Sequence, residues 1–397
     1  MNQIQDACKQ ILKGKDTDSI LRSLPLRVRN DFLEAARIVV DSGKGNKKLA
    51  TRVLSTLVCP GLDGKRIVSW NVDSIRAGIV DAETAACKRK ERPVLDTSPM
   101  GELIRDVDPD IICIQETKLQ SEHEACFSHE GYHTFWSSSR GRKAYSGVSI
   151  WTKEEPIRVS TELPGAPDDL QEEGRILTAF FDGFAVVNTY VPNTLRGGTK
   201  PKGGWCSVRD EDSRVEREAA YDKYVGGRQS WDDAMLAYLK RLKKEVGRVV
   251  WCGDLNVARG LRDIHNGEFS EEKADMAEAA GESEKRVKDL RKRTKEAEDW
   301  AVFGGGAGFR LEERAGLEKI LDSGFVDVYR SVSDGYGFTF HDRTKLGYFA
   351  AGNGWRIDYF VVSDNVLPCV RSIEVLKELG LKDGKPPSDH SPLYIRF

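Results

Sequence analysis

Residues 248–256 read RVVWCGDLN, and this stretch decides the fold class. Its apolar run is too continuous for a strand that has one face in water, so we expect a strand in a sheet covered on both faces. Asp254 ends the run, and Asn256 follows two residues later. The stretch therefore predicts a buried strand that delivers polar side chains at its end.

Similar β-rich runs recur on both sides of this stretch, between helical and loop segments. A long helical segment is expected at 229–246, immediately before it. The other runs lie at residues 66–72, 110–115, 147–151, 175–181, 184–190, 325–329, 356–362 and 392–397. Strands at this density with intervening helices predict an α/β protein, a four-layer α/β sandwich of two mixed β-sheets flanked by helices.

Three stretches read as insertions into this pattern, at 82–98, 195–227 and 268–300. The second is expected to be an enlarged loop, because it is Gly-rich and charged. The second half of the third predicts an exposed helix. We expect such charge runs to be solvated faces.

Residues 1–64 predict a separate helical extension, with residues 65–397 as the catalytic domain. Apolar residues recur at helical spacing in 26–40 and 47–58, and glycines follow each run. Two interpretations stay open, a packing appendage or an accessory contact to nucleic acid or a partner.

Composition indicates a soluble globular protein, with 39% hydrophobic and 31% charged residues. Lys plus Arg (61) nearly equals Asp plus Glu (63), so net charge alone gives no sign of nucleic-acid binding. The eight cysteines lack zinc-ligand spacing, and Cys113 and Cys252 lie in apolar runs. We therefore expect reduced thiols and an intracellular protein, with neither a signal sequence nor a membrane segment.

Polar residues stand where the predicted strands end or begin. Six such places are too many to explain as turn formers alone, and strand ends of α/β folds are where sites form. The residues are Asn71, Asp73, Glu116, Tyr190, Asn193, Asp254, Asn256, Asp358, Asp389 and His390. We expect them to converge on one edge of the sandwich.

The residue types indicate the chemistry of this edge. Carboxylate and amide oxygens, without Cys or His as ligands, suit a hard divalent cation, Mg²⁺ or in its place Mn²⁺. Such a cation polarises a phosphoryl oxygen, an acid activates water, and an imidazolium held by a carboxylate stabilises the phosphorane. The set predicts metal-assisted hydrolysis of a phosphate ester.

The motifs resemble the exonuclease III family of AP endonucleases, within the endonuclease–exonuclease–phosphatase superfamily. They run in the family's order as SWNVDSIRA, IQETKL, YSGVSI, EEGRI, YVPN, WCGDLNVA, GWRIDYFVVS and SDHSPL, over about residues 65–397. GDLN and SDH are shared across the superfamily, whereas WNVD, YVPN and GWRIDYF point to the abasic-site enzymes.

The resemblance implies a role for each matching residue. Glu116 and Asp73 bind the metal, and Asn71 and Asp389 help to shape its site. Asp254 orients or deprotonates water, Asn256 and Tyr190 contact the phosphate, and His390 meets the scissile phosphate with Asp358 behind its ring. For Lys118 two alternatives stay open, a solvated lysine or a substrate-positioning one.

The resemblance also implies how substrate is chosen. Phe340, Trp355 and Ile357 match an apolar pocket for a flipped-out deoxyribose without its base, although ordinary core packing is the alternative. His341 stands where the family has an aromatic residue. Phosphate contacts are expected from Arg76, Arg142, Lys143, Arg175 and Arg196.

The implied activity is Mg²⁺-dependent incision 5′ to abasic sites in duplex DNA, with 3′-end cleaning and 3′→5′ exonuclease activity as additions. We expect a monomer acting in the nucleus of a eukaryote, or in the cytoplasm or nucleoid of a prokaryote. Alternatives are a mainly exonucleolytic or RNA-directed nuclease, a phosphatase for a small phosphoester, or a catalytically silent DNA-binding scaffold. Because every expected acid and His390 are present, the last is disfavoured.

Overall fold

Two six-stranded sheets stack face to face in the computed structural model, which describes residues 2–13, 16–42, 45–76, 98–194, 211–264, 277–302, 307–341, 354–382 and 384–397. The first sheet has the order β11-β12-β1-β2-β4-β3, and the second β5-β6-β7-β8-β10-β9. The first comprises β1 (Arg66–Asn71), β2 (Ile111–Gln115), β3 (His133–Ser137), β4 (Val148–Thr152), β11 (Ser372–Val375) and β12 (Leu393–Arg396). The second comprises β5 (Arg158–Ser160), β6 (Ile176–Phe181), β7 (Phe184–Tyr190), β8 (Val249–Asp254), β9 (Phe325–Asp327) and β10 (Asp358–Ser363).

Both sheets are mixed, as the sequence predicted. β1 runs parallel to β2 and β7 parallel to β8, while β12 and β10 are antiparallel to β1 and β8. All nine predicted strands are present, but β9 ends at Asp327 and the helix α12 (Val328–Val332) begins at once. The sequence missed β3, β5 and β11, which are edge strands. An edge strand is short or half exposed, so it lacks the continuous apolar run that identified the others.

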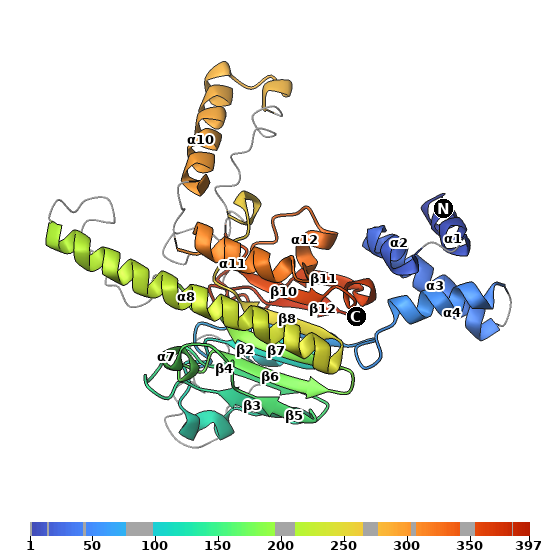
Figure 1. Ribbon diagram of the computed structural model, residues 1–397, viewed down its shortest axis with the longest axis horizontal. Helices are drawn as coiled ribbons and strands as arrows, with labels where there is room; N and C mark the ends of the chain where they lie inside the picture. Colours follow the sequence, from blue (N-terminus) through green and yellow to red (C-terminus); the bar gives the residue numbers. More distant parts are fainter. Residues whose placement is uncertain are drawn as a thin grey trace.

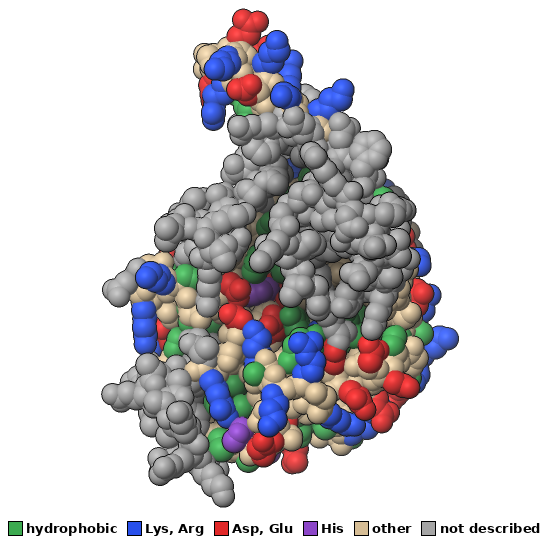
Figure 2. Space-filling view, turned by 90° about the vertical axis from the view of Figure 1, so that its left-hand side faces the viewer, with side chains coloured by type: hydrophobic (Ala, Val, Ile, Leu, Met, Phe, Trp, Pro, Cys, Tyr) green, Lys and Arg blue, Asp and Glu red, His purple; other side chains and the backbone are tan. Residues whose placement is uncertain are grey.

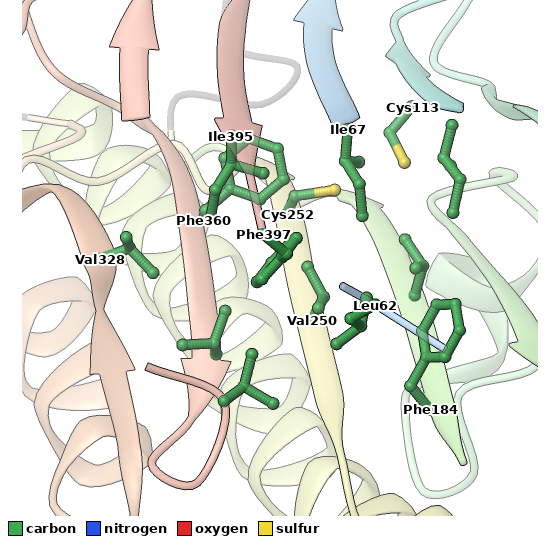
Figure 3. Packing of buried hydrophobic residues seen from close by; sticks show 14 of the residues in the cluster. Leu62, Ile67, Cys113, Phe184, Val250, Cys252, Val328, Phe360, Ile395 and Phe397 are labelled. Atoms are coloured by element: carbon green, nitrogen blue, oxygen red, sulfur yellow. The ribbon is translucent and has the colours of Figure 1, made fainter. Parts of the chain in front are cut away.

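The main core fills the space between the sheets. Figure 3 shows Ile67, Cys113 and Ile395 of the first sheet meeting Val250 and Phe360 of the second. These five side chains are fully buried, so both inner faces are dry. Central strands such as β2 and β8 therefore bury both faces, because helices cover the outer sides.

Helices form the two outer layers, and Figure 1 shows the layer that covers the second sheet. α8 (Glu211–Val246) and α11 (Leu311–Leu321) pack on the second sheet through residues such as Trp231, Leu239 and Leu317. α6 (Pro99–Val107) covers the first sheet through Met100 and Leu103. The four-layer α/β sandwich is thus confirmed.

One prediction about an insertion was wrong. α8 starts at Glu211, so residues 211–227 continue the helix instead of belonging to a loop. The adjacent Gly226 and Gly227 suggested a break, but the helix runs through them because its apolar side is buried on the sheet. The expected exposed helix is present as α10 (Glu284–Val302), which projects from the body in Figure 1. Residues 82–97, 195–210 and 268–276 lie outside the described part.

Four helices precede β1 in the part of the chain that the structure describes. The two expected ones are α3 (Leu26–Ser42) and α4 (Lys47–Leu57), and α1 (Asn2–Leu12) and α2 (Thr17–Ser23) were missed. They share a core that includes Leu21, Phe32 and Val53. This unit packs on the short helix η4 (Leu367–Cys369), where the buried Arg29 donates from Nη1 to the Leu367 carbonyl over 2.9 Å. The contact favours the packing interpretation of residues 1–64.

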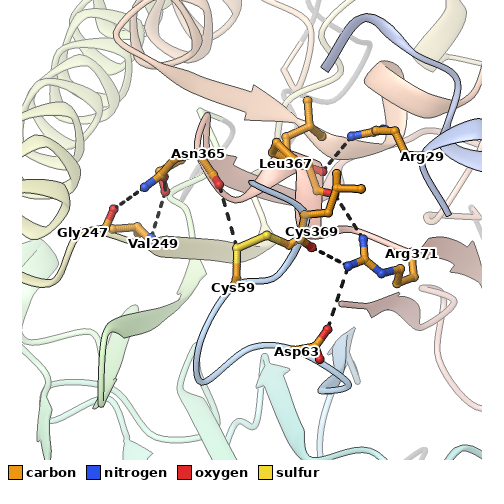
Figure 4. Close-up of a disulfide and its surroundings, with 12 residues drawn as sticks. Arg29, Cys59, Asp63, Gly247, Val249, Asn365, Leu367, Cys369 and Arg371 are labelled. Atoms are coloured by element: carbon orange, nitrogen blue, oxygen red, sulfur yellow. Dashed lines mark hydrogen bonds and ion pairs between the residues drawn. A yellow bond between two sulfur atoms is a disulfide. The ribbon is translucent and has the colours of Figure 1, made fainter. Parts of the chain in front are cut away.

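A disulfide joins Cys59 to Cys369 beside this contact (Figure 4). The expectation of reduced cysteines was therefore wrong for this pair, which the fold brings together across 310 residues of sequence. Cys8, Cys113, Cys126 and Cys252 are free thiols. Among the helices that the structure describes, none combines the length and hydrophobicity required to cross a bilayer.

Candidate active site

The polar strand ends meet at one edge of the sandwich. The parallel strands β1 and β2 end at this edge, as do β7 and β8. β10 is antiparallel to β8, so its first residue, Asp358, pairs with Asp254. β12 is antiparallel to β1, so the loop before it, with Ser388 and His390, lies beside Asn71. Figure 2 shows acidic, basic and histidine side chains close together near the middle of one face.

Asn71 connects the two sheets at this edge. Its Nδ2 donates to Glu116 Oε1 over 3.0 Å and to Asp254 Oδ2 over 2.9 Å. Its Oδ1 accepts the Asp73 amide over 3.0 Å, and its main-chain carbonyl accepts the Ser388 hydroxyl over 2.7 Å. Because Asn71 is fully buried, these bonds fix two carboxylates relative to each other.

The backbone is strained at the same residues. Asp73, Glu116, Lys118 and Asn256 have φ between 48° and 53°, in the left-handed region that side chains disfavour. Each such residue costs about 1–3 kcal/mol and persists where the surroundings determine it completely. Four such residues at one edge indicate a functional site, where a required geometry is kept although it lowers the stability of the fold.

Gly253 lets β8 approach β7 just before Asp254. Its φ is 132°, and a Cβ there would lie 1.9 Å from the Thr189 carbonyl oxygen. Only glycine permits this contact, which places Asp254 beside Tyr190 in the register of the two strands.

His390 lies between two buried carboxylates. Its Nδ1 is 2.7 Å from Asp358 Oδ2, and its Nε2 is 3.9 Å from Asp254 Oδ2. Burial acts to lower the pKa of His390, but Asp358 and then Asp254 outweigh it and raise the pKa to about 10. The ring is therefore an imidazolium at neutral pH, with N–H donors at both nitrogens.

Asp254 is poised to accept a proton. Burial, and next the charge of Asp358, raise its pKa to about 7, although His390 and the Asn256 amide oppose the shift. The Asn256 amide donates to Asp254 Oδ1 over 2.9 Å. A carboxylate with a pKa near neutrality is suited to general-base work.

Asp73 and Glu116 form a second acidic group around Lys118. The Lys118 Nζ lies 2.6 Å from Asp73 Oδ1 and 2.9 Å from Glu116 Oε2. Burial would raise the pKa of Glu116, but Lys118 and the Asn71 bond outweigh it and lower that pKa. Lys118 is thus a paired lysine within the site, and its solvated alternative is disfavoured.

Tyr190 and Arg175 pack together at the end of β7. The guanidinium lies 4.8 Å from the Tyr190 ring centre and donates to the Tyr190 carbonyl over 2.9 Å. Burial, followed by the charge of Glu116, raises the pKa of Tyr190 well above its ordinary value. Arg175 is 2% exposed and also binds Glu173 and Tyr145. Its burial is at odds with the expected phosphate contact, and it supports Tyr190 instead.

Asn256 is held by the loop that follows β7. Its Nδ2 donates to the Val191 carbonyl over 2.9 Å, and Asn193 Nδ2 donates to its Oδ1 over 3.0 Å. Arg228 of α8 donates to the Pro192 carbonyl and is paired with Asp232. The YVPN loop is therefore anchored from behind by a buried ion pair.

The three predicted pocket residues lie in one small apolar cluster. Ile357 is buried in it, and Phe340 and Trp355 pack against it half-buried. The Phe340 ring centre is 5.1 Å from the His390 ring, so the cluster adjoins the imidazole. His341 is buried, and its amide donates to the Asp389 carbonyl over 2.7 Å.

Several members of this region were missed from the sequence. The cluster also includes Ala258, Ile264 and Phe309, and Gly308 lies against the Trp355 ring. Thr339 accepts the Asp358 amide at its hydroxyl, and Ser388 accepts that of His390. Of these, only Ala258 and Ser388 stood inside a quoted motif, WCGDLNVA and SDHSPL.

The expected basic contacts lie in different places. Arg142 and Lys143 are exposed and line a groove of about 630 Å³ with Arg140, Ser138 and Trp136. Arg76 is exposed as well, and Arg196 lies outside the described residues.

Two sets of residues at this edge could hold a metal. Asp254, Asp358 and His390 offer atoms within 4.8 Å of one another, but an imidazolium has no lone pair for a metal. Asp73 and Glu116 offer carboxylate oxygens that already surround one cationic group, the Lys118 ammonium. This oxygen set suits a hard divalent cation better.

Asp389 lies next to the imidazole. Its Oδ1 is 3.5 Å from the Ser388 hydroxyl, and its charge is one of those that raise the pKa of His390. The expected share of Asp389 in the metal site therefore stays a prediction.

The sandwich and its edge define a hydrolase that acts on phosphate esters. Comparison with known families agrees, because the model for the Endonuclease/Exonuclease/phosphatase family matches residues 68–390. The chain belongs to this family.

Within this family, the chain is similar to nucleases that are named for their action on DNA. The chain is 27% identical to an exodeoxyribonuclease of Bacillus subtilis over 331 residues, which cover 83% of this chain and 98% of that one. It is 29% identical to the DNA repair nuclease APEX1 of Danio rerio over 335 residues, which cover 83% and 81%. The solved structure of an AP endonuclease from Archaeoglobus fulgidus has a TM-score of 0.55 at 27% identity, covering 84% and 99%.

Proposed function

We propose that this protein is a DNA repair endonuclease that hydrolyses the phosphodiester 5′ to abasic sites in duplex DNA. The observation that carries the proposal is the apolar cluster of Phe340, Trp355 and Ile357 directly beside the His390 imidazolium. A phosphate bound at His390 would have its adjoining sugar in that cluster. An abasic nucleotide is cheap to extrude because it has no base to unstack, and an apolar wall suits its bare sugar.

His390 and Asp254 have complementary roles, one as a hydrogen-bond donor and the other as a base. His390, held by Asp358, donates from Nε2 to an oxygen of the scissile phosphate and stabilises the charge that develops there. Asp254, on the other side of the ring, takes a proton from the attacking water. Asn256 and Tyr190, held by the YVPN loop and Arg175, contact the phosphate oxygens.

The reaction is expected to need a divalent cation, Mg²⁺ or in its place Mn²⁺. Asp73 and Glu116 would hold it, with Asn71 fixing the Glu116 carboxylate and Asp389 nearby. When bound, such a cation neutralises negative charge on the phosphate and on the leaving oxygen. The Lys118 ammonium, which contacts both carboxylates, then contributes to the same positive charge.

Outside the active site, we expect DNA to be contacted by a few exposed basic residues. Arg142, Lys143 and Arg76 are exposed and available to phosphates, which would make binding salt-dependent. We propose that the protein acts as a monomer, at the place where the cell keeps its DNA. Removal of blocked 3′ ends and 3′→5′ exonuclease activity are proposed as additional activities. We also propose that residues 1–64 form a helical extension and residues 65–397 the catalytic domain.

The test compares three duplexes, one with a tetrahydrofuran abasic analogue, one intact and one with a recessed 3′ end. We expect fast Mg²⁺-dependent incision at the analogue and loss of incision in EDTA. Equal cleavage of all three, or cleavage that survives EDTA, refutes the proposal. His390→Ala and Asp254→Ala should each lower kcat about 10²–10⁴-fold without unfolding the protein.

A further inference from the structure

A cluster of buried charges lies directly behind the apolar pocket. Arg356 stands between Trp355 and Ile357 in the sequence, and its side chain is 1% exposed. Asp263, in the short helix η2 (Leu261–Asp263), and Asp327, at the end of β9, have side chains that are 1–2% exposed. Charges removed from water so completely persist only where their hydrogen bonds are satisfied.

Arg356 meets both carboxylates with a two-pronged contact. Toward Asp263 its Nε donates over 2.7 Å and its Nη2 over 3.2 Å. Toward Asp327 its Nη1 donates over 3.0 Å and its Nη2 over 2.7 Å. Arg330 adds a second cation, with Nε 3.1 Å from Asp263 Oδ1, and the Arg259 Nη1 lies 4.0 Å from Asp327 Oδ2. Only the planar fork of an arginine can make this double contact.

The backbone of the same segment forms the pocket wall. Trp355 exchanges two main-chain hydrogen bonds of 2.8 Å with Phe340, and the Arg356 amide donates to the Asp263 carbonyl over 2.7 Å. Ile357 accepts the Leu255 amide over 2.9 Å. Successive side chains of extended backbone point to opposite sides. Trp355 and Ile357 accordingly join the pocket cluster while Arg356 joins the buried charges.

We propose that Arg356, clamped by Asp263 and Asp327, is a positioning residue that sets substrate selectivity. The clamp fixes residues 355–358, and thereby the spacing between the pocket wall and the Asp358–His390 pair. A pocket that admits a sugar without a base and rejects a complete nucleotide depends on such spacing, because shifts of about 1 Å matter at reacting centres. The inference rests on the proposed function and adds to it a residue that touches no substrate.

Arg356→Lys is the test variant, because lysine keeps the positive charge and loses the fork. Arg29→Lys is the matched control, since Arg29 is also 1% exposed and its guanidinium binds the Leu367 carbonyl beside the N-terminal helices. Both are made in the full chain and compared below their melting temperatures. If Arg356→Lys does not fold, Asp327→Asn takes its place with the same expected direction.

The first readout is the ratio of single-turnover incision rates on a tetrahydrofuran duplex and on the same duplex with an intact nucleotide. We expect Arg356→Lys to lower this ratio at least tenfold, with affinity for the intact duplex changed less than twofold. Arg29→Lys should leave the ratio within twofold of the parent. An unchanged ratio in Arg356→Lys, or an equal fall in Arg29→Lys, overturns the inference.

The second readout needs no DNA and separates this inference from the proposed function. Acrylamide quenching of Trp355 is measured as the difference between each protein and its Trp355→Phe derivative. We expect the quenching constant to rise at least twofold in Arg356→Lys, and an unchanged constant overturns the inference. If the parent shows no preference for abasic DNA while this constant rises, the proposed function fails and the positioning role stands.

Discussion

Asp254 Oδ2 and His390 Nε2 lie 3.9 Å apart. The pKa of each group is raised, and the consequence differs between the two. A raised pKa weakens Asp254 as an acid and makes it a usable base near neutrality. A raised pKa keeps His390 protonated over the whole physiological range. The pair thus holds one group ready to take a proton and another ready to donate a hydrogen bond.

This arrangement predicts the pH dependence of kcat/KM. Asp254 must lose its proton, so activity should rise with pH up to about 7, where its pKa lies. His390 must keep its proton, so activity should hold until about pH 10. A bound cation favours the ionised form of Asp254, so it can shift the rising limb of the kcat/KM profile only to lower pH. Steady-state rates from pH 5 to 10 check this profile, and a fall in kcat/KM between pH 7 and 9 would contradict it.

The same shift predicts a stability effect. An Asp whose folded pKa lies above its unfolded value near 3.9 destabilises the fold once it must ionise, fully so above about pH 7. Asp254→Asn removes that cost of about 4 kcal/mol. Its single carbonyl oxygen can accept only one of the Asn71 and Asn256 bonds, and the buried donor left over costs about 1–3 kcal/mol. We expect the variant to be inactive yet more stable at pH 8, by up to about 3 kcal/mol in free energy of unfolding. Urea unfolding at pH 8 and pH 4 measures it.

At pH 4 both proteins carry a neutral group at this position, so the gain should disappear. A variant that is less stable than the parent at pH 8 would show that the carboxylate contributes to stability.

Sequence reasoning at this scale found residues that lie in motifs and missed residues that support them. Asp254, Asp358 and His390 could be predicted because each follows or precedes an apolar run. Thr339, Arg356 and Asp263 could not, because their roles depend on partners far away in the sequence. Arg175 was assigned to DNA on its charge and its place in a loop near the motifs, whereas the structure buries it beside Tyr190.

Secondary-structure elements show a similar division. Central strands such as β8 and β10 could be predicted because burial on both faces leaves a continuous apolar signal. The edge strands β3, β5 and β11 carry no such signal and were missed. The glycines of α8 suggested a loop, but the helix continues through them. Local propensity is weaker than the burial of Trp231 and its neighbours on the sheet.

The Cys59–Cys369 disulfide ties the segment after α4 to η4. It lies away from the site, because β10 begins at Asp358 in the site and ends at Ser363 shortly before η4. We expect Cys369→Ser to lower the free energy of unfolding by about 2–4 kcal/mol, the usual range for a disulfide. Thermal melting without reductant measures the loss, and kcat should stay within twofold of the parent.

Cys126→Ser is the matched control, since Cys126 is a free and partly exposed thiol. Reductant should lower the melting temperature of the parent and leave that of Cys369→Ser unchanged. Equal effects of reductant on both proteins would contradict the assignment of this disulfide.

For the whole molecule, the near-zero net charge means that DNA affinity depends on where the charges lie. The groove with Arg142 and Lys143 is on the exposed surface, whereas the basic residues of α4 belong to a unit that packs on η4. Arg142→Glu with Lys143→Glu should reduce the slope of log affinity against log salt by about 2, near 0.9 for each lost phosphate contact.

Lys47→Glu with Lys48→Glu makes the same charge change on α4, where both side chains are exposed. It should leave the slope within about 0.5 of the parent if residues 1–64 are a packing unit. Fluorescence anisotropy at several salt concentrations measures both slopes. A larger fall for the α4 pair would restore the alternative, in which this unit contacts nucleic acid.

The position and chemistry of the break test the central claim most directly. A duplex with one natural abasic site, labelled at either end of the damaged strand, is incised with Mg²⁺ and its products are resolved beside size standards. The account predicts a single break on the 5′ side of the site, a 3′-hydroxyl that a polymerase extends, and a 5′-deoxyribose phosphate on the other fragment. A break on the 3′ side, or release of mononucleotides without incision at the site, would contradict it.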